Sequence, residues 1–184
     1  MIQTIISNNC AGAAVMHELG MEFKSPTINL QILPEEFTKF CWNFQNYMRW
    51  DLIEYKPFMM SRVHKDYLYK MFGGVPDMPL GLLWDVMICF QHYETFADAK
   101  KKWDERKARI DYENIGFMFY ARGEEYRKET EDFLALEVIK NKLALTQGFS
   151  VDGSIRFDGD GFSVINGKLL LTQVTDFKAW RENG

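Results

Sequence analysis

The chain has 184 residues and a formal net charge of −4 at pH 7, and 47% of its residues are hydrophobic. Enough apolar residues are present to bury a core, which excludes a disordered chain and predicts one α/β domain over residues 1–184. The acidic balance argues against a broad basic face, so we expect no nucleic-acid partner.

The N-terminal segment combines a strand, a polar turn and a helix that begins at a cysteine. Residues 2–7 predict a buried strand, and residues 10–19 predict a helix that ends at Gly20. The turn between them is Ser7-Asn8-Asn9-Cys10. Because the free N–H groups and the dipole of a helix N-terminus favour an anion, this position predicts a lowered pKa for the thiol.

The middle of the chain alternates short apolar stretches with one amphipathic helix. Residues 28–33 predict a strand, and a proline followed by two acids opens a helix over 34–49. Residues 51–55 predict a short strand. Residues 56–81 contain three of the five prolines and the pair Gly73-Gly74, and they predict an irregular excursion over the surface with a short helix at 64–71.

The strongest strand signal covers residues 82–90, which are apolar on both faces except for Asp85 and predict a central strand. His92 follows at its end, and Thr95 caps a helix predicted over 96–110. Further strands are predicted at 115–120 and 142–146, with a helix at 124–136 between them. Hairpin strands are predicted at 149–151, 155–157, 161–165 and 169–171, separated by Asp-Gly and Asn-Gly turns, and 176–181 predict a last helix. This alternation indicates α/β layers.

Two interpretations of Cys10 remain open. As a functional residue it would be a nucleophile, with Asn8 or Asn9 donating a hydrogen bond to an oxyanion. As a structural residue it would be a small apolar group that packs the helix on the sheet, and the asparagines would cap that helix. If the first strand and the 82–90 strand are parallel neighbours, Cys10 and His92 share one sheet edge and can form a thiolate–imidazole pair. Otherwise His92 would bond a backbone group.

Asp85 needs a partner, because burying a lone carboxylate in an apolar strand costs on the order of several kcal/mol. Arg106 and Arg109 are the expected partners, since residues three apart lie on neighbouring helix faces and guanidinium pairs with carboxylate. A structural ion pair is favoured over a clamp for phosphate or a glycan carboxylate. The Asp158-Gly159-Asp160-Gly161 segment fails the calcium-loop pattern and predicts a hairpin turn.

The three cysteines are an odd number without paired spacing, and Met1 leads directly into a strand. These features predict a reduced, cytoplasmic protein without a signal peptide. No stretch of 18 uninterrupted apolar residues occurs, so no transmembrane segment is expected. No spacing matches a metal site, and we expect no cofactor.

Several spaced blocks, in order along nearly the whole chain, resemble the domain of unknown function 1919 family, whose members are often labelled exopolysaccharide biosynthesis proteins. The matching blocks are Thr4-Ile5-Ile6-Ser7-Asn8-Asn9-Cys10, Leu19-Gly20, Ser25-Pro26-Thr27-Ile28, Pro79-Leu80-Gly81, Asp85-Val86, Phe90-Gln91-His92-Tyr93, Trp103-Asp104-Glu105-Arg106, Arg109-Ile110, Asn114, Asn141-Lys142, Asp176-Phe177 and Trp180. The chain departs from the pattern at Ala11, Ala13 and Lys107, where a larger residue, a glycine and a second arginine are expected.

The resemblance implies a three-layer α/β/α fold with a mixed sheet, and a bacterial cell-surface polysaccharide context. The order of Cys, Asp, His and Arg is also similar to an uncharacterised group described as papain-like cysteine peptidases, in which the cysteine and the histidine would be the catalytic pair. That likeness is one of analogy.

Two functions are therefore expected. The first is an enzyme of surface-glycan assembly, with Cys10 and His92 catalytic and with Asn8, Asn9, Ser25, Asp85, Arg106 and Arg109 as binding residues. It would transfer or hydrolyse an acyl or glycan group. The second is a non-catalytic module that binds a glycan or a nucleotide sugar within a biosynthetic complex. A membrane-associated biosynthetic protein is a further candidate partner.

Overall fold

One of the two four-stranded sheets of the protein is parallel and holds the N-terminal strand at one edge. The computed structural model describes residues 1–184. The strand order is β1-β6-β7-β8, and all neighbours are parallel. The strands are β1 (Thr4–Ser7), β6 (Ile115–Arg122), β7 (Lys142–Gln147) and β8 (Ile155–Phe157).

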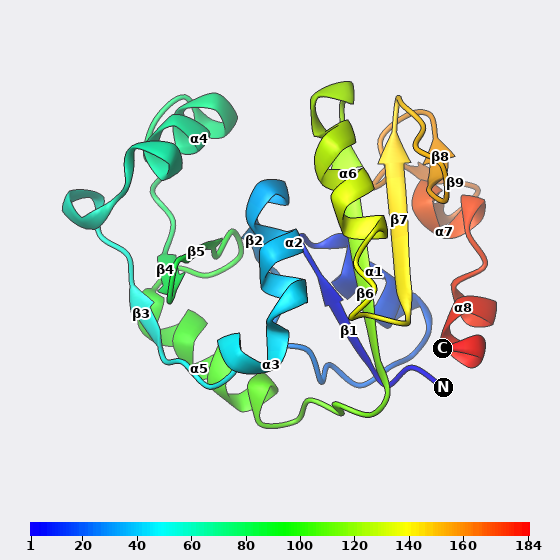
Figure 1. The fold of residues 1–184 in the computed structure, drawn as a ribbon, viewed down its shortest axis with the longest axis horizontal. Coiled ribbons are helices and arrows are strands. Elements are labelled where there is room, and N and C mark those ends of the chain that lie inside the picture. Colours follow the sequence, from blue (N-terminus) through cyan, green and yellow to red (C-terminus); the bar gives the residue numbers. More distant parts are fainter.

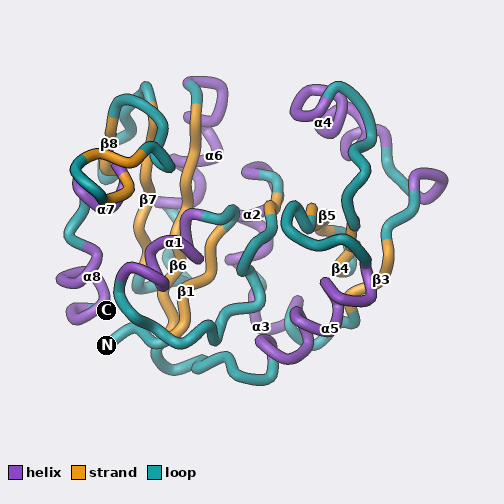
Figure 2. Tube along the Cα trace, turned by 180° about the vertical axis from the view of Figure 1, so that it is seen from behind, coloured by secondary structure: helices purple, strands orange, loops and turns teal.

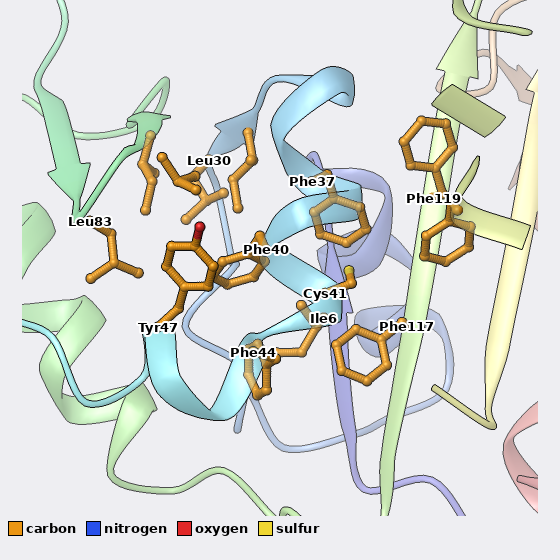
Figure 3. Close-up of a cluster of buried hydrophobic side chains, with 14 of the residues drawn as sticks. Ile6, Leu30, Phe37, Phe40, Cys41, Phe44, Tyr47, Leu83, Phe117 and Phe119 are labelled. Carbon is orange, nitrogen blue, oxygen red and sulfur yellow. The ribbon is translucent and has the colours of Figure 1, made fainter. Parts of the chain in front are cut away.

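Helices cover both faces of this sheet. The helices α2 (Pro34–Trp42) and α6 (Arg127–Leu134) lie on the face toward the viewer in Figure 1, and α1 (Ala11–Glu18) lies on the opposite face, as Figure 2 shows from behind. Alternate side chains of β6 point to opposite faces of the sheet. Phe117 and Phe119 pack toward α2 and α6 (Figure 3). Met118 and Tyr120 pack toward α1. The predicted α/β fold with helices on both sides of a sheet is confirmed.

A second, antiparallel sheet has the strand order β2-β5-β4-β3. Its strands are β2 (Gln31–Ile32), β3 (Leu52–Glu54), β4 (Leu80–Leu83) and β5 (Val86–Cys89). The prediction of one central strand over 82–90 is therefore wrong. The chain reverses at Trp84 and Asp85, where Trp84 takes a φ of 58°. The run hides this turn because it contains none of the glycine or asparagine that usually provides a positive φ.

The condition under which Cys10 and His92 would share one sheet edge is not met, since β1 and β5 belong to different sheets. The sheets meet where β1 ends, and there the backbone N–H of Ile32 donates to the carbonyl of Asn8 at 2.8 Å. This hydrogen bond brings β2 alongside the turn after β1. Because β5 pairs with β2, the end of β5 is also carried to that turn.

Most of the remaining elements follow the predictions, but the predicted hairpin turn over 158–161 is wrong, because β8 before it pairs in parallel with β7 and not with the strand after it. The predicted helix over 34–49 breaks at Asn43 into α2 and α3, and Leu170 and Leu171 enter a helix instead of continuing the predicted strand. Residues 149–151 form no strand. The predicted Asn-Gly hairpin exists between β9 and β10, with positive φ at both turn residues. These elements are α3 (Phe44–Tyr47), η1 (Pro57–Met59), α4 (Arg62–Phe72), α5 (Phe96–Lys107), η2 (Glu124–Tyr126), β9 (Val164–Ile165), β10 (Lys168–Leu169), α7 (Leu170–Val174) and α8 (Phe177–Asn183).

Candidate functional site

The structure brings Cys10 and His92 together. Cys10 stands at the N-cap of α1, and His92 follows β5 on an exposed turn. The Sγ of Cys10 lies 3.4 Å from Nε2 of His92, which is within hydrogen-bonding reach for sulfur. The site thus joins the end of a parallel strand to the end of an antiparallel strand.

The predicted lowering of the Cys10 pKa is not supported. Partial burial of the thiol raises its pKa above the ordinary value, and a hydrogen bond from the backbone opposes this effect less strongly. Desolvation disfavours the charged form, and here it outweighs the favourable start of the helix. The group at rest near pH 7 is therefore a neutral thiol beside an imidazole.

A chain of hydrogen-bonded side chains connects the Cys10 thiol to Tyr67 through two glutamines. The Cys10 Sγ lies 3.9 Å from Oε1 of Gln91 and 3.8 Å from the carbonyl of Leu30. Nε2 of Gln91 donates to Oε1 of Gln31 at 2.6 Å, and Nε2 of Gln31 donates to the hydroxyl of Tyr67 at 2.6 Å. These bonds orient the carbonyl of the Gln91 amide toward the thiol. Sequence reasoning missed Gln31 and Tyr67, because an isolated glutamine or tyrosine carries no pattern.

Asn8 and Asn9 have different surroundings. The buried side chain of Asn8 pairs with the backbone of Tyr120, whose N–H it accepts at 2.9 Å and whose carbonyl it bonds at 3.0 Å. This amide extends the sheet beyond the end of β1, and Asn8 also belongs to the wall of a cleft at the carboxyl ends of β1 and β6. Asn9 accepts from the N–H of Ala11 at 2.9 Å and donates one amide hydrogen to the same carbonyl of Tyr120 at 3.3 Å. Asn9 retains one amide hydrogen, since an amide carries two.

The two predicted arginines act on different parts of the surface. The Nη1 of Arg106 donates to the hydroxyl of Tyr93 at 2.8 Å and lies 3.4 Å from the carbonyl of Ile28. Arg106 therefore fixes the residue after His92. Arg109 is exposed and lies 3.5 Å from a carboxylate oxygen of Glu22.

Asp85 and Ser25 lie elsewhere than predicted. Asp85 is exposed in the turn between β4 and β5, and its partners are Lys39, at 2.9 Å, and the hydroxyl of Tyr47, at 2.7 Å. These groups lower the pKa of the Asp85 carboxyl against the opposing effect of desolvation. The expected pairing with Arg106 or Arg109 is wrong. The Ser25 hydroxyl is fully buried and lies 2.9 Å from the hydroxyl of Thr27, within hydrogen-bonding distance. It therefore stabilises the loop that contains both residues and does not face a ligand.

A cleft of about 480 Å³ opens at the carboxyl ends of β1 and β6, and its walls contain neither Cys10 nor His92. Asn9, Gln31 and Tyr67 belong to its walls, so the cleft borders the surroundings of Cys10. Lys70 and Arg122 contribute cations to the same cleft. Ligands of α/β sheets bind outside the carboxyl ends of the strands, which is where this cleft lies.

Neither a metal centre nor a membrane span is built from these elements. No group of three or more His, Cys, Asp or Glu side chains is placed to hold a metal ion. No helix has both the length and the apolar character required to cross a bilayer. All three cysteines carry free thiols.

Comparison with known proteins identifies the family. Residues 2–152 match the model of the domain of unknown function DUF1919. The chain is also 31% identical over 143 residues to an uncharacterized protein of Haemophilus influenzae, an alignment that covers 78% of this chain and 61% of that protein. The chain thus spans less than two thirds of the length of this relative. With most of its length inside the family model, the chain belongs to the DUF1919 family.

Proposed function

We propose that the chain is a cysteine-dependent transferase or hydrolase of bacterial cell-surface or exopolysaccharide biosynthesis, acting on a glycan or its activated precursor in the cytoplasm. The observation that carries the proposal is the 3.4 Å separation of the Cys10 Sγ from Nε2 of His92 beside a cleft. A thiol within reach of an imidazole is the arrangement that nucleophilic catalysis requires. The glycan context comes from the sequence resemblance, and the free cysteines suit a reducing compartment.

The proposed chemistry begins from a neutral thiol. His92 accepts the Sγ proton as the sulfur attacks the carbonyl carbon of an ester or activated acyl group, which forms the S–C bond. The tetrahedral oxyanion collapses, the bond to the leaving group breaks, and His92 returns the proton to that group. Attack on the resulting thioester by water or by a sugar hydroxyl then releases the product and restores the thiol.

Other residues would position these two groups. The Arg106–Tyr93 bond holds the turn that carries His92, and Gln91 orients the thiol. Asn8 and Asn9 each donate one amide hydrogen to the carbonyl of Tyr120, so each keeps one for an oxyanion, and Asn9 is the more exposed of the two. Arg122 would attract an anionic substrate group, such as the phosphate of a nucleotide sugar, into the cleft, while Lys70 lies 3.9 Å from a carboxylate oxygen of Glu125 in the same wall.

An acyl-enzyme experiment tests the proposal. Incubation with p-nitrophenyl acetate should release nitrophenol and add one acetyl group to the peptide that contains Cys10, as read by mass spectrometry. Cys10→Ser should abolish this label, and His92→Ala should slow its formation by about 10²-fold, the usual size of general-base catalysis. His17→Ala removes an exposed histidine elsewhere on α1 and should leave the rate unchanged. Equal labelling of the wild type and His92→Ala would refute the pair.

The alternative is a non-catalytic module that binds a glycan or a nucleotide sugar within a complex, where a membrane-associated protein could be the partner. The contacts of the thiol with Leu30 and Gln91 favour it, because they would satisfy a purely structural cysteine. Thermal-shift measurements with nucleotide sugars distinguish the two functions. If the chain is a binding module, nucleotide sugars should raise the melting temperature of the wild type and of Cys10→Ser equally, and neither protein should acquire an acyl label.

A further inference from the structure

A second concave region lies at the break between α2 and α3, away from the Cys10–His92 pair. It consists of two adjoining hollows of about 450 and 580 Å³ that share Asn43 and Asn46. Trp42 stands in the first hollow, and Trp50 and Trp84 stand in the second. We call these five residues, together with Arg49, the tryptophan groove.

The three tryptophans of this groove are exposed, although Trp50 and Trp84 touch each other. The ring centroids of Trp50 and Trp84 lie 3.9 Å apart with an interplanar angle of 63°. Trp50 is 48% exposed, Trp84 57% and Trp42 62%. Large aromatic side chains usually bury most of their surface, so a cluster of exposed ones marks a binding surface.

The backbone of Trp84 adopts a conformation that is unfavourable for a bulky residue. Its φ of 58° belongs to the left-handed region, which costs a bulky residue on the order of 1–2 kcal/mol and which glycine or asparagine adopts freely. The next residue, Asp85, is fixed by Lys39 and by Tyr47 of α3. Figure 3 shows Tyr47 beside Leu83, the last residue of β4. The turn is therefore fixed against the helix and presents Trp84 to solvent.

The polar residues of the groove lie between its aromatic ends. The amide of Asn46 donates to Oδ1 of Asn43 at 2.6 Å, which leaves the carbonyl of the first and the amino group of the second for a ligand. Arg49 lines the second hollow and takes part in no ion pair. Its guanidinium is a fork that matches a carboxylate.

We propose that the tryptophan groove binds an acidic saccharide chain. The C–H groups on one face of a sugar ring carry partial positive charge and suit the negative face of an indole, while its hydroxyls suit amide groups. A lipid chain would use the aromatic surface but would leave the paired amides without a role. Arg49 supplies the charge complement of a uronic acid carboxylate.

The groove is separate from the proposed reaction centre. Trp84 precedes β5 and His92 follows it, so the strand separates them by on the order of 10 Å or more. Binding here requires neither the thiol nor the imidazole. The inference therefore goes beyond the proposed function, and Cys10→Ser should bind saccharides as the wild type does even if no reaction occurs.

Calorimetric titration of the whole chain with trigalacturonate and with cellotriose tests the proposal. Trigalacturonate should bind, and Trp50→Ala and Trp84→Gly should each weaken binding at least about tenfold, a change equivalent to one aromatic contact. Arg49→Ala should weaken trigalacturonate by about tenfold and leave cellotriose unchanged. Trp84→Gly keeps the fold testable, since glycine accepts the φ at that position.

Matched controls lie outside the groove. Phe162→Ala removes an exposed aromatic ring and Arg62→Ala an exposed guanidinium, and both should leave the affinity unchanged. The proposal is overturned if trigalacturonate fails to bind at millimolar concentration. It is also overturned if Arg49→Ala affects cellotriose and trigalacturonate alike, or if the two controls weaken binding as much as the groove variants do.

Discussion

The Cys10 Sγ lies 3.4 Å from Nε2 of His92, although the first residue follows a strand of the parallel sheet and the second follows a strand of the antiparallel sheet. The contact depends on β2, which is bonded to the turn after β1 on one side and to β5 on the other. Two residues 82 positions apart are thus joined through a two-residue strand.

The pH dependence of Cys10 alkylation follows from its surroundings. Because burial raises the pKa of the thiol, we expect the rate with iodoacetamide to rise with a midpoint above 9.0, its ordinary value. Peptide mapping measures the rate at which iodoacetamide alkylates Cys10 at a series of pH values between pH 6 and about 11. Cys41 and Cys89 are buried and should stay unlabelled in the folded protein, which serves as the control. A midpoint below 9.0 would instead indicate a stable thiolate–imidazolium pair.

The two predicted arginines should differ in their effect on acylation. Arg106→Ala removes the bond to the Tyr93 hydroxyl and frees the turn that carries His92, so the acylation rate should fall by about tenfold. Tyr93→Phe removes the same bond from the other side and should reproduce the effect. Arg109→Ala alters an exposed contact with Glu22 and should leave the rate as it is. Similar losses in both arginine variants would contradict a positioning role for Arg106.

Asn8→Ala should lower the free energy of unfolding by about 3 kcal/mol, since the N–H of Tyr120 loses its partner while buried and its carbonyl keeps only a longer bond. Asn9→Ala removes the cap of the Ala11 N–H and should cost about 1 kcal/mol. Urea unfolding of the two variants gives both values. A loss for Asn8→Ala no larger than that for Asn9→Ala would show that the pairing with Tyr120 contributes little to stability.

Stability should decrease in alkaline solution. Burial raises the pKa of the Cys89 thiol from 9.0 to about 12, with a smaller contribution from the charge of Glu36. Above pH 9 the unfolded chain therefore releases this proton while the folded chain keeps it, so unfolding becomes easier as the pH rises. The slope is about 1.4 kcal/mol per pH unit for one such group.

Urea midpoints of the wild type and of Cys89→Ala between pH 7 and about 11 measure this contribution. Cys89→Ala should have the lower stability at pH 7, because a cavity replaces the sulfur, and the shallower decline above pH 9. Parallel declines for the two proteins would show that the Cys89 thiol keeps an ordinary pKa when folded.

The elements with strong local signals could be predicted from the sequence. The α1 helix, the Thr95 cap, in which the side chain accepts from the N–H of Asp98, and the Asn166-Gly167 hairpin all follow from caps and turn residues that act over a few positions. The break at Asn43 and the turn at Trp84 lack such signals. Tertiary contacts, above all those of Asp85 with Lys39 and Tyr47, fix that turn instead.

The candidate site was predictable in its two central residues and not in its surroundings. Cys10 and His92 each follow a strand, and this placement is visible in the sequence. The bridge through β2 is not, because two residues give no strand pattern. The role of Asn8 also depends on Tyr120, 112 positions away, and the partner of Arg106 depends on how α5 lies against the turn after β5.

The hydrogen bond between Ile32 and Asn8 has a consequence for when the thiol and the imidazole can act. Each sheet carries one of the two groups, and neither sheet alone can bring them together. A partly folded chain in which only one sheet has formed holds a cysteine and a histidine but no pair. Activity that depends on both groups would therefore report the docking of the two sheets, and any change that separates them would switch it off without altering either residue.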